Sequence, residues 1–327
     1  MVDPERDIAT VLQESGPEYA AFEYERPTAG HQGEVFLVTL TVGAERYEVV
    51  VKFQAGDPGF ALEPFLHEYV ADRTAVPVPR ILVFEESPAQ DVEPYFVTER
   101  VRGENLAESF GGLGPETRER VLGHAGRALG EMHASVGFEG FGRLTLDDGR
   151  LIVDDLTWDW AACFQRLVTD YVDRLGRTPF ADLQGTARDH LNGAIGLVES
   201  TGPPRLVHDD FRPANMLFEA GDDDPITAVL DWQLALAADA EYHLARTEFL
   251  FVDPAFGDRE ARERLRERIH EGYRQHCAFE VDEGFERRRP IYYFATLLWR
   301  MLGFEAAFDD AGELARGRAE ARYRRQF

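Results

Sequence analysis

The chain has 327 residues, with 60 Asp and Glu against 35 Lys and Arg, so its formal net charge is −25 at pH 7. Affinity for nucleic acid comes from Lys and Arg that neutralise phosphates, so this charge argues against a nucleic-acid partner. Since 44% of the residues are hydrophobic and 12% are aromatic, the chain can build a packed core, which argues against intrinsic disorder.

Lysine is almost absent from the chain, because Lys52 is the only one and the other 34 basic residues are arginine. Self-repulsion at this net charge destabilises a compact chain in dilute buffer, whereas about 1 M salt shortens the Debye length to roughly 3 Å. We therefore expect a protein from a salt-accumulating halophile. An ordinary acidic bacterial protein and a polycation-binding protein are the alternatives.

Cysteine content and hydropathy indicate the compartment. Cys163 and Cys277 are the only cysteines, and they fit neither a disulfide framework nor a zinc site. The N-terminal stretch is acidic and lacks the apolar segment of a signal peptide, and no run reaches the roughly 18 apolar residues of a membrane span. The sequence thus predicts a cytoplasmic protein with no membrane partner.

Residues 1–102 are expected to form a small, strand-rich domain with one helix. Runs rich in β-branched and aromatic residues predict its strands at 34–40, 47–53, 80–84 and 95–98. A short glycine-containing turn joins the first two runs, which indicates a hairpin. The helix is expected from Leu62 to Thr74, before a segment with two prolines.

Residues 103–327 are expected to form a larger, mainly helical domain. Apolar residues at helical spacing follow Pro115, which opens the first helix. Further helices are predicted near 155–175, 179–200, 238–252, 257–277 and 287–306, and short strands at 206–207, 215–218 and 228–231. The predicted fold class is α+β, with a β-rich domain followed by a helical one.

The most specific motif follows the strand predicted at 206–207. His208 and Asp210 form an H-x-D segment, Asn215 follows five residues later, and Asp231 ends an apolar run beyond it. Phosphoryl transfer needs a carboxylate to orient or accept the proton of the attacking hydroxyl, which is the role predicted for Asp210. Mg²⁺ prefers oxygen ligands, which Asn215 and Asp231 would supply. We expect His208 to hold the loop by a hydrogen bond.

These residues resemble the aminoglycoside phosphotransferase and choline kinase-like family, relatives of the protein kinases that phosphorylate small molecules. The residues that carry the resemblance are His208, Asp210, Phe211, Asn215, Met216 and the segment Leu230-Asp231-Trp232. The resemblance covers roughly residues 20 to 300. It implies a bilobal protein-kinase-like fold, with residues 1–102 covering the nucleotide and 103–327 carrying the catalytic loop, the metal site and the acceptor pocket. ATP or GTP with Mg²⁺ is the implied donor.

A kinase holds the α- and β-phosphates with a cation on its third strand, and a helix glutamate positions that cation. Lys52 ends one predicted strand and Glu68 lies in the predicted helix, where the family carries these two residues. In a chain that has arginine almost everywhere else, a retained lysine is expected where a planar guanidinium cannot substitute. The alternative is that one surface lysine survived by accident.

Other positions of the resemblance concern the nucleotide and the acceptor. Gly30 and Gly33 occupy the place of the phosphate-covering loop, although a plain hairpin turn is an alternative interpretation. Glu99 and Val101 fall at the hinge, where family members bind adenine through backbone groups. Candidates for lining the acceptor pocket are Trp158, Asp159, Trp160, Asp239 and Glu241.

Three residues depart from the family pattern without removing a catalytic group. Asp209 stands where glycine is usual, and it either raises the pKa of the neighbouring base by like-charge repulsion or points to solvent. Arg212 stands where many members have histidine, and it would pair with Asp209 or contact substrate. His243 replaces an aspartate that is usually buried.

We therefore predict an Mg²⁺-dependent enzyme that moves the γ-phosphate of ATP or GTP to a hydroxyl of a small molecule, such as an aminoglycoside, choline or a sugar. A catalytically silent nucleotide-binding module with a regulatory role is the first alternative. A protein Ser/Thr kinase is the second, and the lack of an Ala-Pro-Glu segment after Asp231 argues against it.

Overall fold

The structure is a computed structural model that describes residues 3–15, 18–27, 34–54, 59–88, 92–221, 224–252, 258–309 and 311–327. The chain divides into two compact units, each made of several segments. The first unit contains Met1–His124, Leu146–Arg150 and Pro213–Leu234, and the second contains Ala125–Thr145, Leu151–Arg212 and Ala235–Phe327. The roles expected for residues 1–102 and 103–327 stay predictions.

A five-stranded antiparallel sheet in the order β1-β2-β3-β5-β4 is the base of the first unit. Its strands are β1 (Ala21–Glu25), β2 (Glu34–Val42), β3 (Glu45–Phe53), β4 (Ile81–Glu85) and β5 (Tyr95–Glu99). Alternate side chains of β2 and β3 are buried on one face, as period-2 patterning requires. The hairpin predicted from the turn between these two strands is confirmed.

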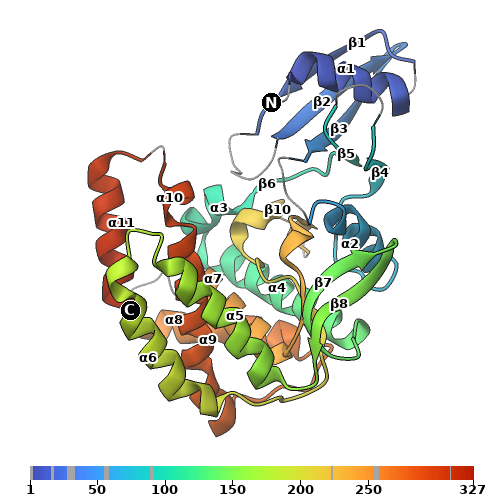
Figure 1. Ribbon diagram of the computed structural model, residues 1–327. Coiled ribbons are helices and arrows are strands. Elements are labelled where there is room, and N and C mark those ends of the chain that lie inside the picture. Colours follow the sequence, from blue (N-terminus) through green and yellow to red (C-terminus); the bar gives the residue numbers. More distant parts are fainter. Residues whose placement is uncertain are drawn as a thin grey trace. The chain divides into compact units, whose positions relative to one another are not determined.

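Two helices accompany this sheet, although the sequence predicted only one. Helix α1 (Pro4–Ser15) packs Ile8, Val11 and Leu12 against the buried face of the sheet (Figure 1). These apolar residues recur at helical spacing, but over less than two turns, which is a short signal. Helix α2 (Leu62–Ala71) is the predicted one, and it ends three residues before Thr74.

A second, three-stranded sheet in the order β11-β10-β6 completes the first unit. It contains β6 (Glu104–Asn105), β10 (Met216–Phe218) and β11 (Ile226–Val229), and helix α3 (Leu106–Ser109) follows β6. Gly103 has a φ of +125°, and a Cβ there would lie 2.7 Å from the Thr227 hydroxyl oxygen, so this position requires glycine. These pairings explain why the residues just after 102 belong to the first unit.

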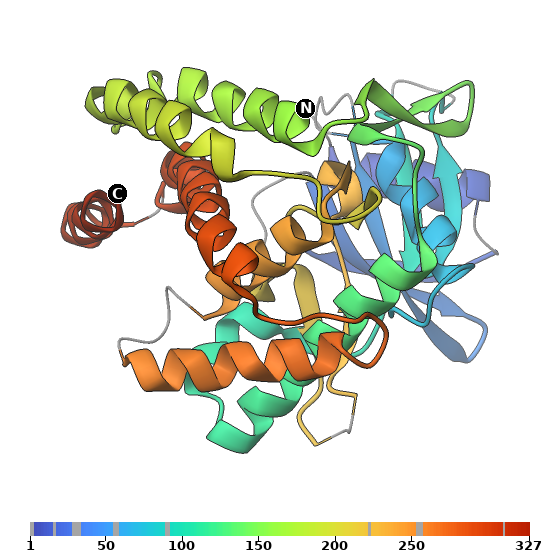
Figure 2. The same ribbon diagram turned by 90° about the horizontal axis from the view of Figure 1, so that it is seen from below.

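The second unit is mainly helical. Helix α4 (Pro115–Ser135) enters it from the first unit, and its other helices are α5 (Trp160–Leu175), α6 (Gln184–Ala194), α7 (Ala240–Phe251), α8 (Arg259–Tyr273), α9 (Glu283–Leu302), α10 (Phe304–Ala307) and α11 (Glu313–Gln326). Helices α5 and α6 run side by side in both views (Figures 1 and 2), and α9 packs against α5 and α7. Helix α11 has almost no apolar periodicity and was not predicted.

A four-stranded antiparallel sheet in the order β8-β7-β12-β9 lies mainly in the second unit. Its strands are β7 (Phe141–Asp147), β8 (Arg150–Thr157), β9 (Arg205–Val207) and β12 (Leu236–Ala238). The hairpin of β7 and β8 was not predicted, and residues 155–157 are strand instead of helix. Among the described helices, none combines the length and the apolar character that a membrane span requires.

Candidate active site

Lys52 lies near the end of β3 and makes two ion pairs within the first unit. Its Nζ is 2.6 Å from Glu63 Oε2 and 2.9 Å from Asp231 Oδ1. Burial disfavours the charged amine, but the two carboxylates more than offset that effect, so the pKa of Lys52 is raised. The only lysine of the chain is therefore a buried cation held between carboxylates from two distant segments, and it is no accidental surface residue.

The helix glutamate that pairs with Lys52 is Glu63, so the prediction of Glu68 is wrong. At about 100° per residue, Glu63 shares a buried face of α2 with Leu66 and Val70, whereas Glu68 falls on the exposed face. A carboxylate on the apolar face of a predicted helix was the sequence signal for this role, because a buried charge needs a partner. Position relative to the prolines pointed to the wrong carboxylate.

Asn215 and Asp231 flank the same end of the β10–β11 pair. Asn215 directly precedes β10, Asp231 follows β11, and the two strands are antiparallel. The Leu230 N–H donates to the Asn215 carbonyl oxygen at 2.9 Å. Asp231 has a φ of +68°, a left-handed conformation that aspartate tolerates better than most residues. The fold thus brings to one end of a strand pair two residues with oxygen-bearing side chains, which lie sixteen residues apart in sequence.

These two side chains fit the donor set that Mg²⁺ takes in nucleotide sites. Mg²⁺ there binds one or two protein oxygen ligands and completes its shell with waters and phosphates. Within the described ranges, no cluster of three or more His, Cys, Asp and Glu side chains could hold a metal ion on its own. The Asp231 carboxylate is partly exposed and lies next to the Lys52 cation. Together with the amide oxygen of Asn215, it therefore suits a metal that arrives with a nucleotide.

The remaining nucleotide positions give less information. Gly30 and Gly33 lie outside the described residues. Glu99 ends β5, and its side chain contacts Arg80 at 3.4 Å on the surface. The Glu99 N–H donates to the Arg80 carbonyl oxygen, and Val101 follows half-buried. A contact of Glu99 or Val101 with a nucleotide base stays a prediction.

The loop that carries Asp210 lies in the second unit, directly after β9. The Asp210 N–H donates to His208 Nδ1 at 3.2 Å, which confirms that His208 holds the loop. Arg212 Nε lies 2.6 Å from Asp210 Oδ1, so Arg212 pairs with the predicted base and not with Asp209. The Arg212 guanidinium also lies over the ring of Trp299. Asp210 is buried, and this cation lies directly beside its carboxylate.

Asp209 is buried in an ion-pair network, so the expectation that it points to solvent is wrong, while its effect on the neighbouring predicted base stays a prediction. Asp209 has a left-handed backbone conformation, with a φ of +60°, and only 4% of its surface is exposed. The Tyr242 hydroxyl donates to Asp209 Oδ1 at 2.7 Å, and Arg246 Nε lies 3.2 Å from the same oxygen. Arg246 Nε also donates to the Asp209 carbonyl oxygen at 2.6 Å. Arg246 of α7 thereby contacts both the backbone and the side chain of the residue before the predicted base.

Burial shifts the pKa values of this network, and pairing opposes the shifts. Burial raises the pKa of Asp209, while the Arg246 charge and the Tyr242 hydroxyl lower it. Burial also disfavours the charge of Arg246, but Asp209 offsets that effect and the pKa of Arg246 is raised. The Arg246 guanidinium lies 4.5 Å from the ring centroid of Trp299. Sequence reasoning missed Arg246, which has no motif of its own.

His243 lies in a chain of buried hydrogen bonds. Its Nδ1 is 2.9 Å from His133 Nε2, and His133 Nδ1 is 2.8 Å from the Tyr273 hydroxyl. Burial lowers the pKa of His133 to about 3, with help from the Arg205 charge, and it lowers the pKa of His243 well below its usual range. Both histidines are therefore neutral and structural.

Four of the five residues expected to line an acceptor pocket have structural partners. Asp159 and Asp239 cap helices α5 and α7 by accepting the N–H groups of Ala161 and Glu241. Trp160 is fully buried in the core of the second unit. Glu241 pairs with Arg288 at 2.8 Å. Trp158, which is 74% exposed, has no structural partner of this kind, and Asp159 is also exposed, so both are accessible to a ligand.

The sequence and the structure were compared with known proteins. Residues 23–291 match the phosphotransferase enzyme family. No curated protein matches the chain. A Ralstonia eutropha JMP134 protein provisionally named an aminoglycoside phosphotransferase has a TM-score of 0.61 at 16% identity, over 98% of this chain and 95% of that one.

Two further solved structures are aminoglycoside phosphotransferases, each bound to ADP and to a second small molecule. A thermostable mutant of APH(4)-Ia, bound to ADP and hygromycin B, has a TM-score of 0.56 at 20% identity over 97% of each chain. APH(3'')-Id from Streptomyces rimosus ATCC10970, bound to ADP and streptomycin, has a TM-score of 0.56 at 15% identity, over 91% of this chain and 98% of that one.

At these identities the likeness shows the fold alone, and it confirms the predicted α+β, protein-kinase-like fold class. The family match is independent of that likeness and covers most of the chain. The chain belongs to the phosphotransferase enzyme family.

Proposed function

We propose that this protein transfers the γ-phosphate of ATP or GTP to a hydroxyl group of a small molecule, with Mg²⁺ bound beside the nucleotide. The observation that carries the proposal is the pairing of the only lysine with Glu63 and Asp231, at 2.6 and 2.9 Å. Phosphoryl transfer needs a cation that a helix carboxylate positions and that lies next to a carboxylate able to bind a metal ion. Lys52, Glu63 and Asp231 have this arrangement.

The first unit would hold the donor. Lys52 neutralises the α- and β-phosphates, and Glu63 fixes the direction of the ammonium. Asn215 and Asp231 would hold Mg²⁺. The metal, when bound, neutralises the charge that develops on the β- and γ-phosphate oxygens.

The second unit would supply the base. The acceptor oxygen bonds to the γ-phosphorus while the bond from that phosphorus to the bridging oxygen breaks, and ADP or GDP leaves. Asp210 orients the acceptor hydroxyl and takes its proton, which then passes to solvent. Arg212 keeps the Asp210 carboxylate in one position, and the grip of Arg246 on Asp209 positions the adjoining backbone.

The acceptor class is a small-molecule alcohol. The solved relatives with bound ligands hold ADP together with an aminoglycoside-type drug, and another neighbour at 17% identity is named an aminopropanol kinase. Aminoglycosides, choline-like amino alcohols and sugars are therefore the acceptors to test.

The test is an assay of ADP and GDP release with a panel of these alcohols, at low and molar KCl with Mg²⁺. Release that depends on an acceptor, and a phosphorylated acceptor identified by mass spectrometry, support the proposal. Nucleotide binding without transfer to any acceptor contradicts it and favours a regulatory module.

A further inference from the structure

A pocket of about 400 Å³ opens in the first unit beside α2, and neither Lys52 nor Glu63 lines it. Helix α2 contributes Ala61, Pro64, Phe65 and Glu68 to its lining. At about 100° per residue, Phe65 and Glu68 lie roughly 160° and 140° around the helix axis from Glu63, and Pro64 lies about 100° from it. The pocket is therefore separate from the residues proposed to hold the nucleotide, but it shares a helix with one of them.

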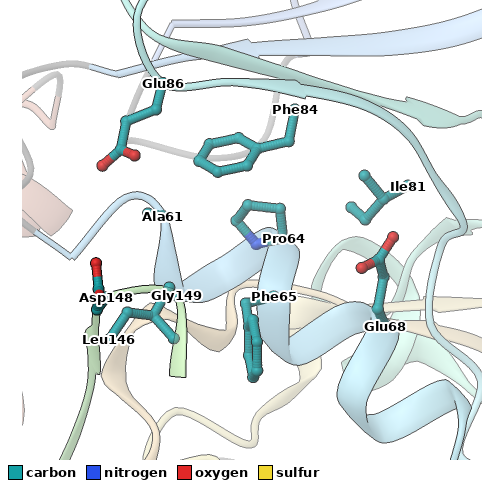
Figure 3. Close-up of a pocket in the computed structure, with 10 residues that line it drawn as sticks. All are labelled: Ala61, Pro64, Phe65, Glu68, Ile81, Phe84, Glu86, Leu146, Asp148 and Gly149. Carbon is teal, nitrogen blue, oxygen red and sulfur yellow. The ribbon is translucent and has the colours of Figure 1, made fainter. Parts of the chain in front are cut away.

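The other walls come from β4 and from the turn between β7 and β8. They supply Ile81, Phe84, Glu86, Leu146, Asp148 and Gly149. Figure 3 shows the Phe84 ring above Pro64, with Glu86 and Asp148 toward one end of the pocket and Glu68 toward the other. Phe84 is 39% exposed, so its ring is accessible from the pocket.

The lining carries negative charge only. Glu68, Glu86 and Asp148 contribute three carboxylates, and none of the described residues that line the pocket is basic. None of the three forms an ion pair with another residue in the described part of the chain, whereas arginine partners are common among its surface acids, as in Glu260 with Arg264. Unpaired carboxylates around an aromatic ring favour a cation, because both attract positive charge.

The size and spacing of the lining narrow the class of cation. No three metal-type side chains among the described residues converge on one point, which argues against a metal ion here. Three carboxylates also repel phosphates, which argues against a nucleotide. A volume of about 400 Å³ with apolar walls suits a small organic molecule.

We propose that this pocket binds an organic ammonium ion with an apolar body, and that its occupancy strengthens nucleotide binding through α2. Pro64 lines the pocket and Glu63, the next residue in the chain, holds Lys52 at 2.6 Å. A ligand packed against Ala61, Pro64 and Phe65 favours the position of the helix in which that ion pair forms. The regulatory half of the proposal rests on the proposed function, since it requires Lys52 to hold the nucleotide.

Benzyltrimethylammonium is the probe for the pocket, because it has no hydroxyl group and cannot serve as a phosphate acceptor. Calorimetric titration of the full chain without nucleotide, at 0.1 M KCl, measures its Kd. N,N-dimethylbenzamide and phenylacetate are the neutral and anionic controls, and both are expected to bind more weakly. Equal binding of the neutral control overturns the assignment of a cation site.

Two variants place the probe. F84A is expected to weaken binding about two- to fivefold, the usual range of one exposed cation–π contact. Glu68→Gln with Glu86→Gln and Asp148→Asn is expected to weaken it about tenfold, since each exposed charge pair contributes modestly. A matched variant changes three exposed glutamates outside the pocket, Glu18, Glu45 and Glu116, to Gln. Equal losses in the two triple variants overturn the site, because net charge alone then explains binding.

The regulatory half is tested by titrating Mg²⁺ with a non-hydrolysable ATP or GTP analogue, with and without saturating probe. The probe is expected to tighten nucleotide binding, and the nucleotide is expected to tighten probe binding by the same factor. The triple pocket variant is expected to lose this coupling. Unchanged nucleotide affinity overturns the regulation. If no nucleotide binds at all, the proposed function fails, while the probe titration still decides whether the pocket is a cation site.

Discussion

Replacing Asp209 with asparagine removes one charge from the buried network of the second unit, together with the Oδ2 atom that accepts the Tyr171 hydroxyl at 3.5 Å. Asparagine has nearly the same shape and tolerates the left-handed backbone of this position, where φ is +60°. Its amide oxygen can still accept the Tyr242 hydroxyl. Arg246, which is 1% exposed, then loses its paired carboxylate at 3.2 Å.

The expected cost follows from that exposure. Removing one partner of a buried ion pair costs about 3–5 kcal/mol, because the other charge stays buried without compensation. The ring of Trp299, 4.5 Å from the guanidinium, offsets only part of this. We expect D209N to lower the free energy of unfolding by about 3 kcal/mol, a large share of the roughly 5–15 kcal/mol typical of a folded domain.

Urea unfolding followed by circular dichroism measures this loss in D209N, R246M and the double variant. The double variant is expected to be more stable than the sum of the single losses predicts, because R246M removes the unpaired charge. Asp182→Asn is the matched control, since Asp182 pairs with Arg324 at 2.8 Å on the surface, where water already solvates both charges. A loss in D209N no larger than that in D182N would refute the reasoning.

Three further predictions concern the nucleotide site, acid stability and salt. Lys52→Arg is expected to weaken binding of an Mg²⁺–nucleotide analogue at least tenfold, with an unchanged circular dichroism spectrum. Glu63→Gln is expected to weaken the same binding more than Glu68→Gln does. A larger loss of binding in Glu68→Gln would indicate that Glu68 is the partner of Lys52. His133, with a pKa of about 3 in the fold against an ordinary 6.5, binds a proton only after unfolding, so its contribution to stability is complete above pH 6.5. That contribution falls by about 1.4 kcal/mol per pH unit between about pH 6.5 and 3; urea unfolding at pH 7 and 5 should show a smaller pH dependence in H133Q, and equal slopes would contradict the assignment. At a net charge of −25, the melting temperature is expected to be higher in molar KCl than in dilute buffer, and equal values would contradict the halophile hypothesis.

Residue type and spacing were enough to predict several parts of the fold and the site. Two runs of β-branched and aromatic residues around a short turn predicted the β2–β3 hairpin, and Lys52, predicted to act as a cation at the end of the second run, is a buried, ion-paired residue there. The hairpin of β10 and β11 places Asn215 and Asp231 at one end, as their positions before and after apolar runs imply. These features depend on local pattern, which the sequence displays directly.

Features that depend on tertiary contacts were beyond this kind of reasoning. Glu63 and Glu68 both lie in helix α2. Which of the two faces Lys52 depends on how the helix packs against the sheet, and this packing is a tertiary contact. Asp209 was expected to perturb the base or to face solvent, because nothing in the sequence links it to Arg246, 37 residues later. Helix α1 and the β7–β8 hairpin have short patterns that compete with loops and helices.

The measurement that tests the central proposal most directly is the turnover number of Asp210→Asn with the acceptor found in the panel. We expect kcat to fall about 100- to 10,000-fold, the usual contribution of a general base, while the affinity for the Mg²⁺–nucleotide complex stays within twofold of the unaltered protein. Wild-type turnover in this variant would contradict the assignment of Asp210 as the base and with it the proposed mechanism.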